Sequence, residues 1–585
     1  MIINSDTKIP IENHFRVAAG PGAGKTHWLV NHINNILQTS NRLGQTRKIA
    51  CITYTNIAVD TILCRLGSEA NQVEVSTIHS FLYKHIVKPY CSFLSTDFEL
   101  NVEKLDGHDD TIVSYRRTKE WIENHPKVSE LKHPFSHNQL IKIPNNRKAL
   151  MNWLGSLNYE FDDSDELKII GNKDKAIFKN SKGITRLSNK CLEILESNLL
   201  EYKKLYWKDG LVDHNDILYF SYELVKRYPF ILTVLRAKFP YFLVDEFQDT
   251  NPIQTKLLKM IGEAETIVGV IGDQAQSIYS FQGAKPEQFS SFHLTNLSDY
   301  TMIDNRRSTN QIIDVLNYVR KDIQQNKYRN VNNDIPTIIV GERIKAFHKV
   351  KELSKNEEIY SLSRDNITSN AMKIEIEDTK LEQGLHDHLI DVDTNSQRCN
   401  AVIAFISAVE LSKYGKYKAA IKKIEYIFKV KEDPISRKKA ALNCLFFLLE
   451  TYVTYKDKCL MEFYNVLKTN IDNNLASFRN GRAKTFYETY TYKQLSLCVN
   501  IVEDTSKHKT IHKAKGDEFN NVLLVLEERD LDFLLKPNLM NNEEHRVYYV
   551  AISRARERLF INVPTLSDKK SDKLRKIFNI IALND

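Results

Sequence analysis

The sequence predicts an α/β protein with two parallel-sheet domains, each carrying a largely helical insertion. Three observations predict this fold. Short β-rich runs alternate with helical patterns in the first third of the chain, this alternation stops and returns twice, and turn-forming residues are scarce. The 585 residues include only 19 glycines and 14 prolines, about half the usual share, which favours long helices. At roughly 150 residues per domain, the length predicts about four domains.

In the first half, β-rich runs are each followed by a turn or a helical pattern. The predicted strands are Phe15–Ala19, 48–53, Val73–Thr77, 241–245 and 266–272. Helices are expected over 26–38, from Asn56 and from His79. Charged helical patterns replace this rhythm from about 89 to 210, which predicts one α/β domain with an inserted helical block.

The second half repeats the design. Its predicted strands are 300–303, 337–340, 359–362, 521–526 and 559–563. A second helical block lies between about 370 and 495, where one helix face carries an apolar stripe of Ile421, Ile424, Ile427 and Phe428, with Lys422 and Lys423 on the other side. The predicted boundaries are 1–88 and 211–298 for the first sheet domain, 89–210 for its insertion, 299–370 and 496–585 for the second, and 371–495 for its reduced insertion.

Composition excludes several classes of protein. The N-terminus lacks the basic-then-apolar pattern of a signal peptide, and no apolar run reaches the roughly 18 residues of a membrane span. The eight cysteines form no CxxC pair, which fits a reducing cytoplasm and gives no support for structural zinc. The net charge of +8 permits a polyanionic partner without requiring one.

A phosphate-loop pattern lies between the first predicted strand and the first predicted helix. It comprises Ala19, Gly20, Pro21, Gly22, Ala23, Gly24, Lys25 and Thr26. Glycines let backbone N–H groups surround phosphates, Lys25 supplies a positive charge, and the Thr26 hydroxyl suits Mg²⁺. The alternative is a glycine-rich turn with a chance Lys-Thr pair, which this strand–helix context disfavours.

An acidic pair follows the apolar run YFLV. Asp245 is predicted to hold Mg²⁺ and Glu246 to position and deprotonate the attacking water. The alternative is an ordinary acidic loop, which is a common feature after a strand. The long separation of this pair from Thr26 fits the inserted block.

Together these motifs resemble those of superfamily 1 helicases of the UvrD/Rep type. The similar segments are GPGAGKT, ITYTNIAVDTI (52–62), STIHSF (76–81), DEFQDTNPIQ, IGDQAQSIYSFQGA, DNRRST (304–309), TIHKAKGDEF (510–519) and EEHRVYYVAISRARERL (543–559). They occur in the family's order along nearly the whole chain. The resemblance implies two RecA-like domains.

The resemblance also implies the rest of an ATP site. Gln276 corresponds to the residue that senses the γ-phosphate, and Arg307 and Arg554 to arginines that reach it from the second domain. Glu518, near Gly516, corresponds to a ribose contact. Each arginine alone has the alternative interpretation of a solvated surface residue.

A strand-binding face is implied in the same way. Its residues are Thr55, Asn56, Thr77, His79, Phe81, Tyr279, Phe281, Thr510 and His512. Hydroxyls and amides hold phosphates without reading sequence, and aromatic rings stack on bases. The alternative is that the aromatics belong to the core and that His79 is structural.

The chain departs from the family pattern at several positions. No Gln precedes Gly20, His27 stands where the family has Arg, and Arg306 replaces the base-stacking Tyr. These three departures put strict adenine selectivity in doubt. Gln282 replaces an Arg, and Ile57 replaces a Lys, which weakens the expected coupling between ATP and DNA.

The sequence therefore predicts an ATP- and Mg²⁺-dependent translocase or helicase that moves 3′ to 5′ on single-stranded or tailed DNA. The alternative is a DNA-activated ATPase that signals to, or loads, a partner nuclease without unwinding. The compact chain resembles the helicase subunits of anti-phage systems such as Gabija, which act beside a separate nuclease. Antiviral defence and DNA repair are thus both open.

Overall fold

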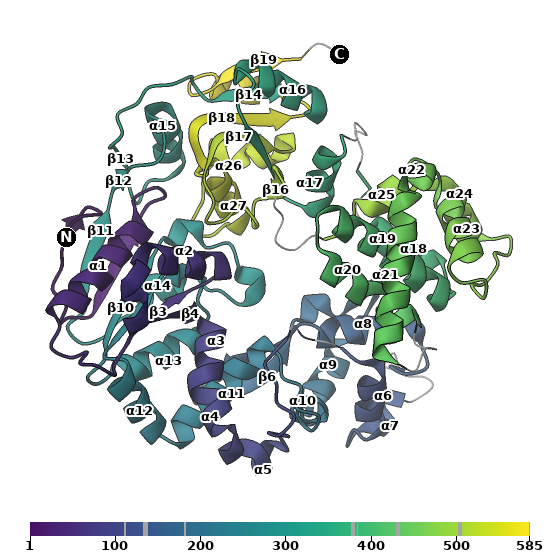
Figure 1. Ribbon diagram of the computed structural model, residues 1–585, viewed down its shortest axis with the longest axis horizontal. Coiled ribbons are helices and arrows are strands. Elements are labelled where there is room, and N and C mark those ends of the chain that lie inside the picture. Colours follow the sequence, from purple (N-terminus) through teal and green to yellow (C-terminus); the bar gives the residue numbers. More distant parts are fainter. Residues whose placement is uncertain are drawn as a thin grey trace. The chain divides into compact units, whose positions relative to one another are not determined.

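The computed structural model describes residues 1–109, 111, 113–132, 139–180, 183–375, 381–382, 384–428, 433–500 and 506–583. The chain forms two compact units (Figure 1). Unit 1 comprises residues 1–179, 183–331 and 537–549, and unit 2 comprises 180–182, 332–536 and 550–585. Each unit is described by itself below.

Unit 1 contains a seven-stranded parallel sheet in the order β1-β11-β2-β10-β9-β3-β4. The strands are β1 (Ile2–Ile3), β2 (Phe15–Ala19), β3 (Ile49–Thr53), β4 (Val73–Thr77), β9 (Tyr241–Val244), β10 (Ile267–Gly272) and β11 (Ser298–Met302). Every residue of β3, β9 and β10 is buried, as expected where helices cover both faces of a parallel sheet. The five strands predicted in the first half are confirmed.

The strand predicted over 300–303 was assigned to the second domain, and this assignment is wrong. It forms β11, which pairs with β2 from Ser298–Phe15 to Met302–Ala19. Tyr300 and Met302 are buried in the same core as Val17, so their alternation serves the first sheet. The two units divide after Val331, later than the expected boundary at 298.

Helix α1 of unit 1 shows why its sequence is helical. Gly24 precedes it in the left-handed conformation, and the apolar residues Leu29, Ile33 and Ile36 bury one face. Besides α1, unit 1 has further helices outside its insertion. The helices are α1 (Lys25–Thr39), α2 (Asn56–Leu66), α3 (Ile78–Leu82), α4 (Lys88–Tyr90), α5 (Ser95–Phe98), α11 (His214–Arg227), α12 (Phe230–Lys238), α13 (Pro252–Gly262), α14 (Glu287–Ser291) and α15 (Asn310–Val319).

The block inserted after β4 has its own core, built around Trp121, Trp153 and Tyr202. Its helices are α6 (Tyr115–Glu123), α7 (Val128–Lys132), α8 (Pro144–Leu154), α9 (Asn189–Glu196) and α10 (Leu199–Trp207). It also contains four strands in two pairs, β5 (Leu157–Phe161) with β6 (Leu167–Gly171), and β7 (Ile177–Asn180) with β8 (Gly183–Arg186). The block is therefore less purely helical than predicted.

Unit 2 contains a six-stranded sheet in the order β16-β15-β17-β18-β14-β19. The strands are β14 (Thr337–Val340), β15 (Ile359–Ser363), β16 (His508–Thr510), β17 (Phe519–Val525), β18 (Ala555–Val563) and β19 (Asn579–Ala582). Four of them confirm predicted strands, and β16 and β19 were not predicted. With unit 1, the arrangement matches two RecA-like sheets.

The helical block of unit 2 packs around a core that contains Phe405, Leu445 and Phe463. The predicted stripe is confirmed, since Ile424 is buried there and Ile421, Ile427 and Phe428 pack against it. The helices of the unit are α16 (Arg343–Leu353), α17 (Asn366–Lys373), α18 (Leu385–Val392), α19 (Ser396–Lys413), α20 (Tyr417–Ile424), α21 (Pro434–Glu450), α22 (Tyr452–Tyr455), α23 (Leu460–Asn470), α24 (Arg482–Thr489), α25 (Tyr492–Ser496), α26 (Asp532–Leu535) and α28 (Asp568–Leu574); α27 (Glu543–Ile552) begins in unit 1.

Across the part of the chain that the structure describes, none of the helices combines the length and apolarity of a membrane span.

Candidate nucleotide and DNA site

The predicted site residues of unit 1 follow the carboxyl ends of its strands. Since neighbouring strands are parallel, these ends lie along one edge of the sheet. Along that edge, the loops after β11, β2, β10 and β9 carry the predicted nucleotide residues, and the loops after β3 and β4 carry predicted DNA residues. One sheet edge therefore gathers both sets.

The phosphate loop leaves β2 at Ala19 and enters α1 at Lys25. Gly22 and Gly24 have φ angles of 72° and 84°, which glycine adopts without strain. No side chain caps α1 and its first turn carries no acidic residue, so its N-terminal amides are available to an anion. Lys25 has no ion-pair partner among the described residues.

Asp245 and Glu246 follow β9 directly. Asp245 is buried, its backbone N–H donates to the carbonyl of Ile52 at 2.8 Å, and its carboxylate accepts from the N–H of Glu246 at 3.0 Å. Glu246 has a φ of 53°, an uncommon conformation for a residue other than glycine. This turn directs the carboxyl end of β9 into the short helical segment 247–249.

Gln248 links this segment to the loop after β10. Its amide N–H donates to a carboxylate oxygen of Glu246 at 2.5 Å, and its carbonyl accepts from the backbone N–H of Asp273 at 2.9 Å. Asp273 in turn accepts from the amide of Gln276 at 2.5 Å. Glu246, the predicted base, and Gln276, the predicted γ-phosphate sensor, are thus joined through a chain of hydrogen bonds.

Arg320 was not predicted, yet its buried guanidinium holds Asp273. Its Nη1 lies 2.7 Å from the Asp273 carboxylate, and its Nε and Nη2 bind Asp322 at 2.8 and 2.9 Å. The ring of Tyr549, from the motif at 543–559, lies 5.9 Å from the guanidinium. A lone arginine outside the recognised motifs gave no sequence signal.

Arg307 belongs to unit 1, so the expectation that it comes from the second domain is wrong. Its backbone N–H donates to Asn305 at 2.9 Å, and an added Cβ at Gly22 would lie 2.8 Å from the Cβ of Arg307. The segment 304–307 therefore packs directly on the phosphate loop. The cause is β11, which brings this segment to the edge beside β2.

The neighbouring Arg306 explains one departure from the family. Its guanidinium lies 3.9 Å from the ring centre of Tyr328 and pairs with Asp6 at 3.0 Å. Asp6 also contacts His27 at 3.3 Å. An aromatic ring is thus present beside Arg306, although Arg306 itself replaces the Tyr of the family. The ring belongs to Tyr328, and the motif at 304–309 gives no indication of it.

The predicted DNA-contacting hydroxyls also cap helices. The Thr55 side chain accepts from the N–H of Ala58, at the start of α2, and Thr77 accepts from Ser80, at the start of α3. Asn56 is exposed. These positions fix the helix starts at the same sheet edge as the phosphate loop.

His79 lies among other histidines. Its ring centre is 5.4 Å from that of His214 and 6.2 Å from that of His108. Burial, and then these two rings, lower the pKa of His79 to about 3. The ring is therefore neutral near pH 7 and acts by hydrogen bonding or packing.

The expectation that Phe81 stacks on bases is wrong. Phe81 is fully buried, and its ring packs against Phe239 and Phe242 at 5.1 and 5.0 Å. Helix α3 turns this side chain toward the sheet, so it serves the core of unit 1.

Tyr279 and Phe281 differ from Phe81. Tyr279 stacks on Tyr54 with ring centres 4.7 Å apart, and Phe281 is 68% exposed. The Tyr54 hydroxyl donates to Gln282. The loop after β10 thus contacts the loop after β3, and the exposed ring of Phe281 lies 5.8 Å from that of Tyr279.

The predicted residues of unit 2 form two groups. Arg554 precedes β18, and its Nη1 donates to the carbonyl of Asp517 at 3.3 Å. This contact brings Arg554 to the turn that holds Gly516 and Glu518, at the start of β17. Thr510 ends β16, where its buried hydroxyl accepts from Lys513 N, and His512 follows two residues later.

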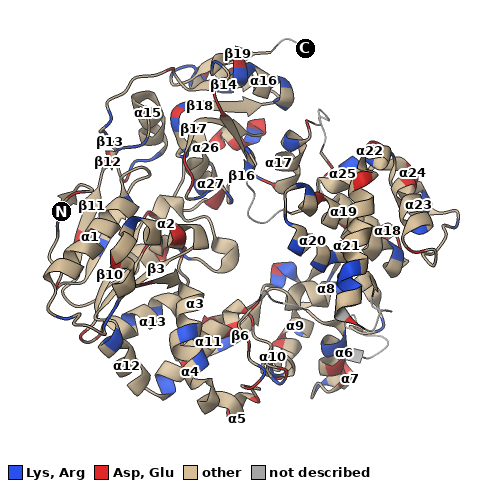
Figure 2. Cartoon of the chain, in the orientation of Figure 1, with Lys and Arg blue, Asp and Glu red and all other residues tan. Residues whose placement is uncertain are grey.

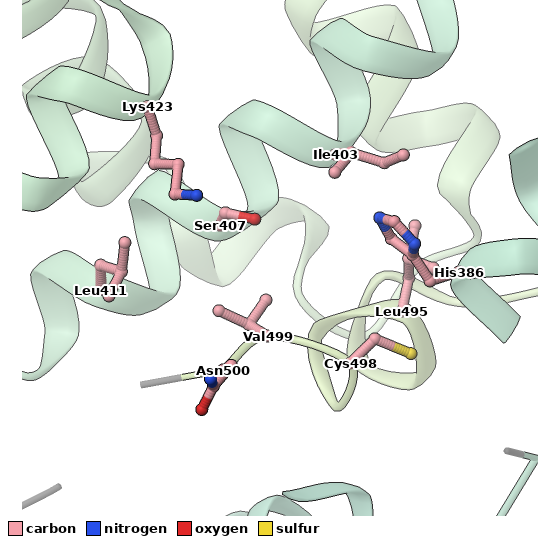
Figure 3. A pocket seen from close by; sticks show the side chains of 9 residues that line it. All are labelled: His386, Ile403, Ser407, Leu411, Lys423, Leu495, Cys498, Val499 and Asn500. Atoms are coloured by element: carbon pink, nitrogen blue, oxygen red, sulfur yellow. The ribbon is translucent and has the colours of Figure 1, made fainter. Parts of the chain in front are cut away.

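A cavity of about 130 Å³ lies within the helical block of unit 2 (Figure 3). None of the predicted site residues lines it. The lining residues are His386, Ile403, Ser407, Leu411, Lys423, Leu495, Cys498, Val499 and Asn500. Burial raises the pKa of the Cys498 thiol, so this cavity offers no activated nucleophile.

Comparison with known proteins identifies the family. Residues 4–296 match the UvrD/REP helicase N-terminal domain, and residues 300–565 match the UvrD-like helicase C-terminal domain. Gabija protein GajB of Bacillus cereus is 28% identical over 52% of this chain and 46% of its own length. A probable DNA helicase II homolog of Mycoplasma capricolum is 27% identical over 63% and 49%.

The ATP-dependent DNA helicase PcrA of Bacillus subtilis is 23% identical over 97% of this chain and 82% of its own length. The matches thus span about half the length of the first two relatives and most of the third. Because the two family models cover nearly every residue, the chain belongs to the UvrD/REP family of ATP-dependent DNA helicases.

Proposed function

We propose that this chain uses ATP hydrolysis to move 3′ to 5′ along single-stranded DNA and to unwind duplex DNA, with the two RecA-like domains closing and opening during each cycle. The observation that carries the proposal is the sheet edge of unit 1. There, the loops for nucleotide and for DNA follow neighbouring parallel strands, so a change at one loop reaches the next through short contacts.

The donor set at this edge fits a magnesium nucleotide. The Thr26 hydroxyl and the Asp245 carboxylate are hard oxygen ligands of the kind that Mg²⁺ takes. They follow β2 and β9, which are separated only by β10. Bound there with ATP, the ion would neutralise charge on the phosphates.

The chain's own residues carry the other roles. Lys25 and the uncapped amides of α1 bind the phosphates, and Glu246 takes the proton of the attacking water. Gln276 senses the γ-phosphate. Its amide donates to Asp273, the backbone N–H of Asp273 donates to Gln248, and the Gln248 amide donates to Glu246, so the sensor and the base are connected. Arg307 and Arg554 stabilise the transferred phosphoryl group, and Gly516 and Glu518 contact the ribose.

The DNA track of the proposal uses Thr55, Asn56, Thr77, His79, Thr510 and His512 for the backbone. Tyr279 and Phe281 supply stacking, and Phe81 takes no part. The contact between Tyr279 and Tyr54 joins the loop after β10, which carries Gln276, to the loop that carries Thr55. This contact supports coupling between nucleotide and DNA.

The test measures ATP turnover with and without single-stranded DNA, and separation of duplexes with a 3′ or a 5′ tail. We expect DNA to stimulate turnover and only the 3′-tailed duplex to separate. Glu246→Gln should abolish turnover and keep ATP binding, whereas Glu263→Gln, an exposed residue after α13, should change neither. Turnover that persists in Glu246→Gln would refute the assignment of the base.

A second candidate is a DNA-activated ATPase that signals to, or loads, a separate nuclease. The observation that favours it is Gln282, which replaces an arginine of the family and is engaged by Tyr54. The similarity to Gabija protein GajB supports a role in defence. DNA-stimulated turnover without separation of any tailed duplex would select this candidate.

A further inference from the structure

Asp273 is a buried acid at the end of an apolar strand. It directly follows β10, and its side chain is 0% exposed. Strands β10 and β3 of the same sheet carry no Lys, Arg, Asp or Glu (Figure 2). A buried carboxylate is costly unless a positive group pairs with it. Arg320, which is itself 2% exposed, supplies that group, with its Nη1 2.7 Å from Oδ1 of Asp273.

The two oxygens of this carboxylate contact different groups. Oδ1, beside Arg320, also accepts from the backbone N–H of Ala275 at 3.2 Å, and Oδ2 accepts from the side-chain amide of Gln276 at 2.5 Å. An ionised carboxylate only accepts hydrogen bonds, so Gln276 must turn its amide nitrogen, and not its oxygen, toward Asp273. Because the ion pair with Arg320 contains the ionised carboxylate, Arg320 fixes the orientation of this amide.

Arg320 is in turn held by an acid at the surface. Its Nε and Nη2 donate to the two carboxylate oxygens of Asp322 at 2.8 and 2.9 Å. This forked pairing fixes the plane of the guanidinium, and Nη1 then lies beside Asp273. Since Asp322 is 53% exposed, a chain of charged contacts runs from the surface through Arg320 and Asp273 to Gln276.

We propose that Arg320 is a positioning residue for ATP hydrolysis, which acts through Asp273 to orient the amide of Gln276 toward the γ-phosphate. The inference rests on the proposed function, in which Gln276 senses that phosphate. Misplacing such a group by about 1 Å costs about 100-fold in rate, so loss of Arg320 should slow turnover at saturating ATP. Lys25 and the amides of α1 bind the phosphates by other contacts, so KM should change little.

Steady-state ATP turnover of the full chain with saturating single-stranded DNA provides the test. At about 20 °C, where domains of ordinary stability stay folded, Arg320→Leu should lower kcat about 10–100-fold and leave KM within about twofold. Arg320→Lys keeps the positive charge and should be at least about threefold faster than Arg320→Leu. Asp322→Ala changes an exposed side chain, so it should fold like the parent and lower kcat about threefold by releasing the guanidinium.

Arg398→Leu is the matched control for the loss of a buried ion pair. Arg398 donates to both carboxylate oxygens of the buried Asp393, at 2.8 and 2.6 Å, and it belongs to α19 in the helical block of unit 2. Its replacement should lower the unfolding temperature in calorimetry, as Arg320→Leu does, and leave kcat unchanged.

A double-variant comparison separates positioning from folding. If Arg320 acts through Gln276, then Arg320→Leu should lower the kcat of Gln276→Ala by less than about twofold. Three results would each overturn the proposal while the proposed function stands: a parental kcat in Arg320→Leu, an equal loss of kcat in Arg398→Leu, or fully multiplicative losses in R320L/Q276A. A parent without DNA-stimulated turnover would overturn the proposed function and this inference together.

Discussion

Replacing Arg320 by leucine should destabilise unit 1 strongly. The guanidinium is almost fully buried and neutralises Asp273, whose side chain is 0% exposed. Leucine removes the positive charge and leaves that carboxylate buried, while Asp322, which is about half exposed, can turn to solvent. Breaking a buried pair in this way costs about 3–5 kcal/mol.

Calorimetry provides the measurement. At about 2 °C per kcal/mol for a large unit, the unfolding temperature of Arg320→Leu should fall by about 6–10 °C. Arg320→Lys keeps the positive charge, so its unfolding temperature should fall less. Asp273→Asn removes the buried negative charge that Arg320 neutralises. The loss of stability in the double variant R320L/D273N should therefore be smaller than the sum of the losses in the two single variants.

The double-mutant cycle decides whether the reasoning holds. An Arg320→Leu protein that unfolds within 1 °C of the parent would show that Asp273 does not need this partner. Strict additivity of the two changes would show that the pair is not coupled.

Three further predictions follow from individual contacts. Gly269→Ala places a Cβ 2.1 Å from the ring of Phe15 and should cost about 1–3 kcal/mol in urea unfolding. Gly155→Ala places its Cβ 3.4 Å from the carbonyl oxygen of Met151 and should cost less. Burial lowers the pKa of His32 to about 4. Its neutral ring therefore stabilises the fold fully above pH 6.5, and this contribution is lost as the pH falls toward 4, by about 2 kcal/mol at pH 5. His32→Phe should flatten that loss in unfolding curves measured from pH 7 to 5. Phe281→Ala should weaken single-stranded DNA binding by about 1–3 kcal/mol in fluorescence anisotropy without changing stability; an equal loss of stability would show that Phe281 supports the fold instead.

The strands and the nucleotide motifs were predictable because their signals are local. A buried parallel strand such as β9 is a continuous apolar run, and the phosphate loop combines glycines with Lys25 within eight residues. The matching of β11 to the first sheet was not predictable, since pairing with β2 depends on contacts between residues 283 positions apart. β1 has only two residues and leaves no pattern to detect.

The side-chain errors have a common physical origin. A motif fixes the order of residue types, but it does not fix which face of a short helix a side chain occupies. Phe81 lies in α3, which turns it into the core, while Phe281 lies in the short 3-10 helix Ser280–Gln282 after β10 and remains exposed. Likewise, Tyr328 reaches Arg306 because β13 (Asn326–Lys327) pairs with β12 (Asp304–Asn305), an arrangement no local pattern records.

The inserted block of unit 1 leaves the sheet after β4 and the chain re-enters at β9. Since β4 is the edge strand and β3 alone separates it from β9, the block can be exchanged without rethreading any other strand. Its separate core around Trp121 and Trp153 lets a replacement fold around its own side chains. The ATPase could therefore be given a different appendage by grafting at this junction, and the phosphate loop on β2 would keep its neighbours.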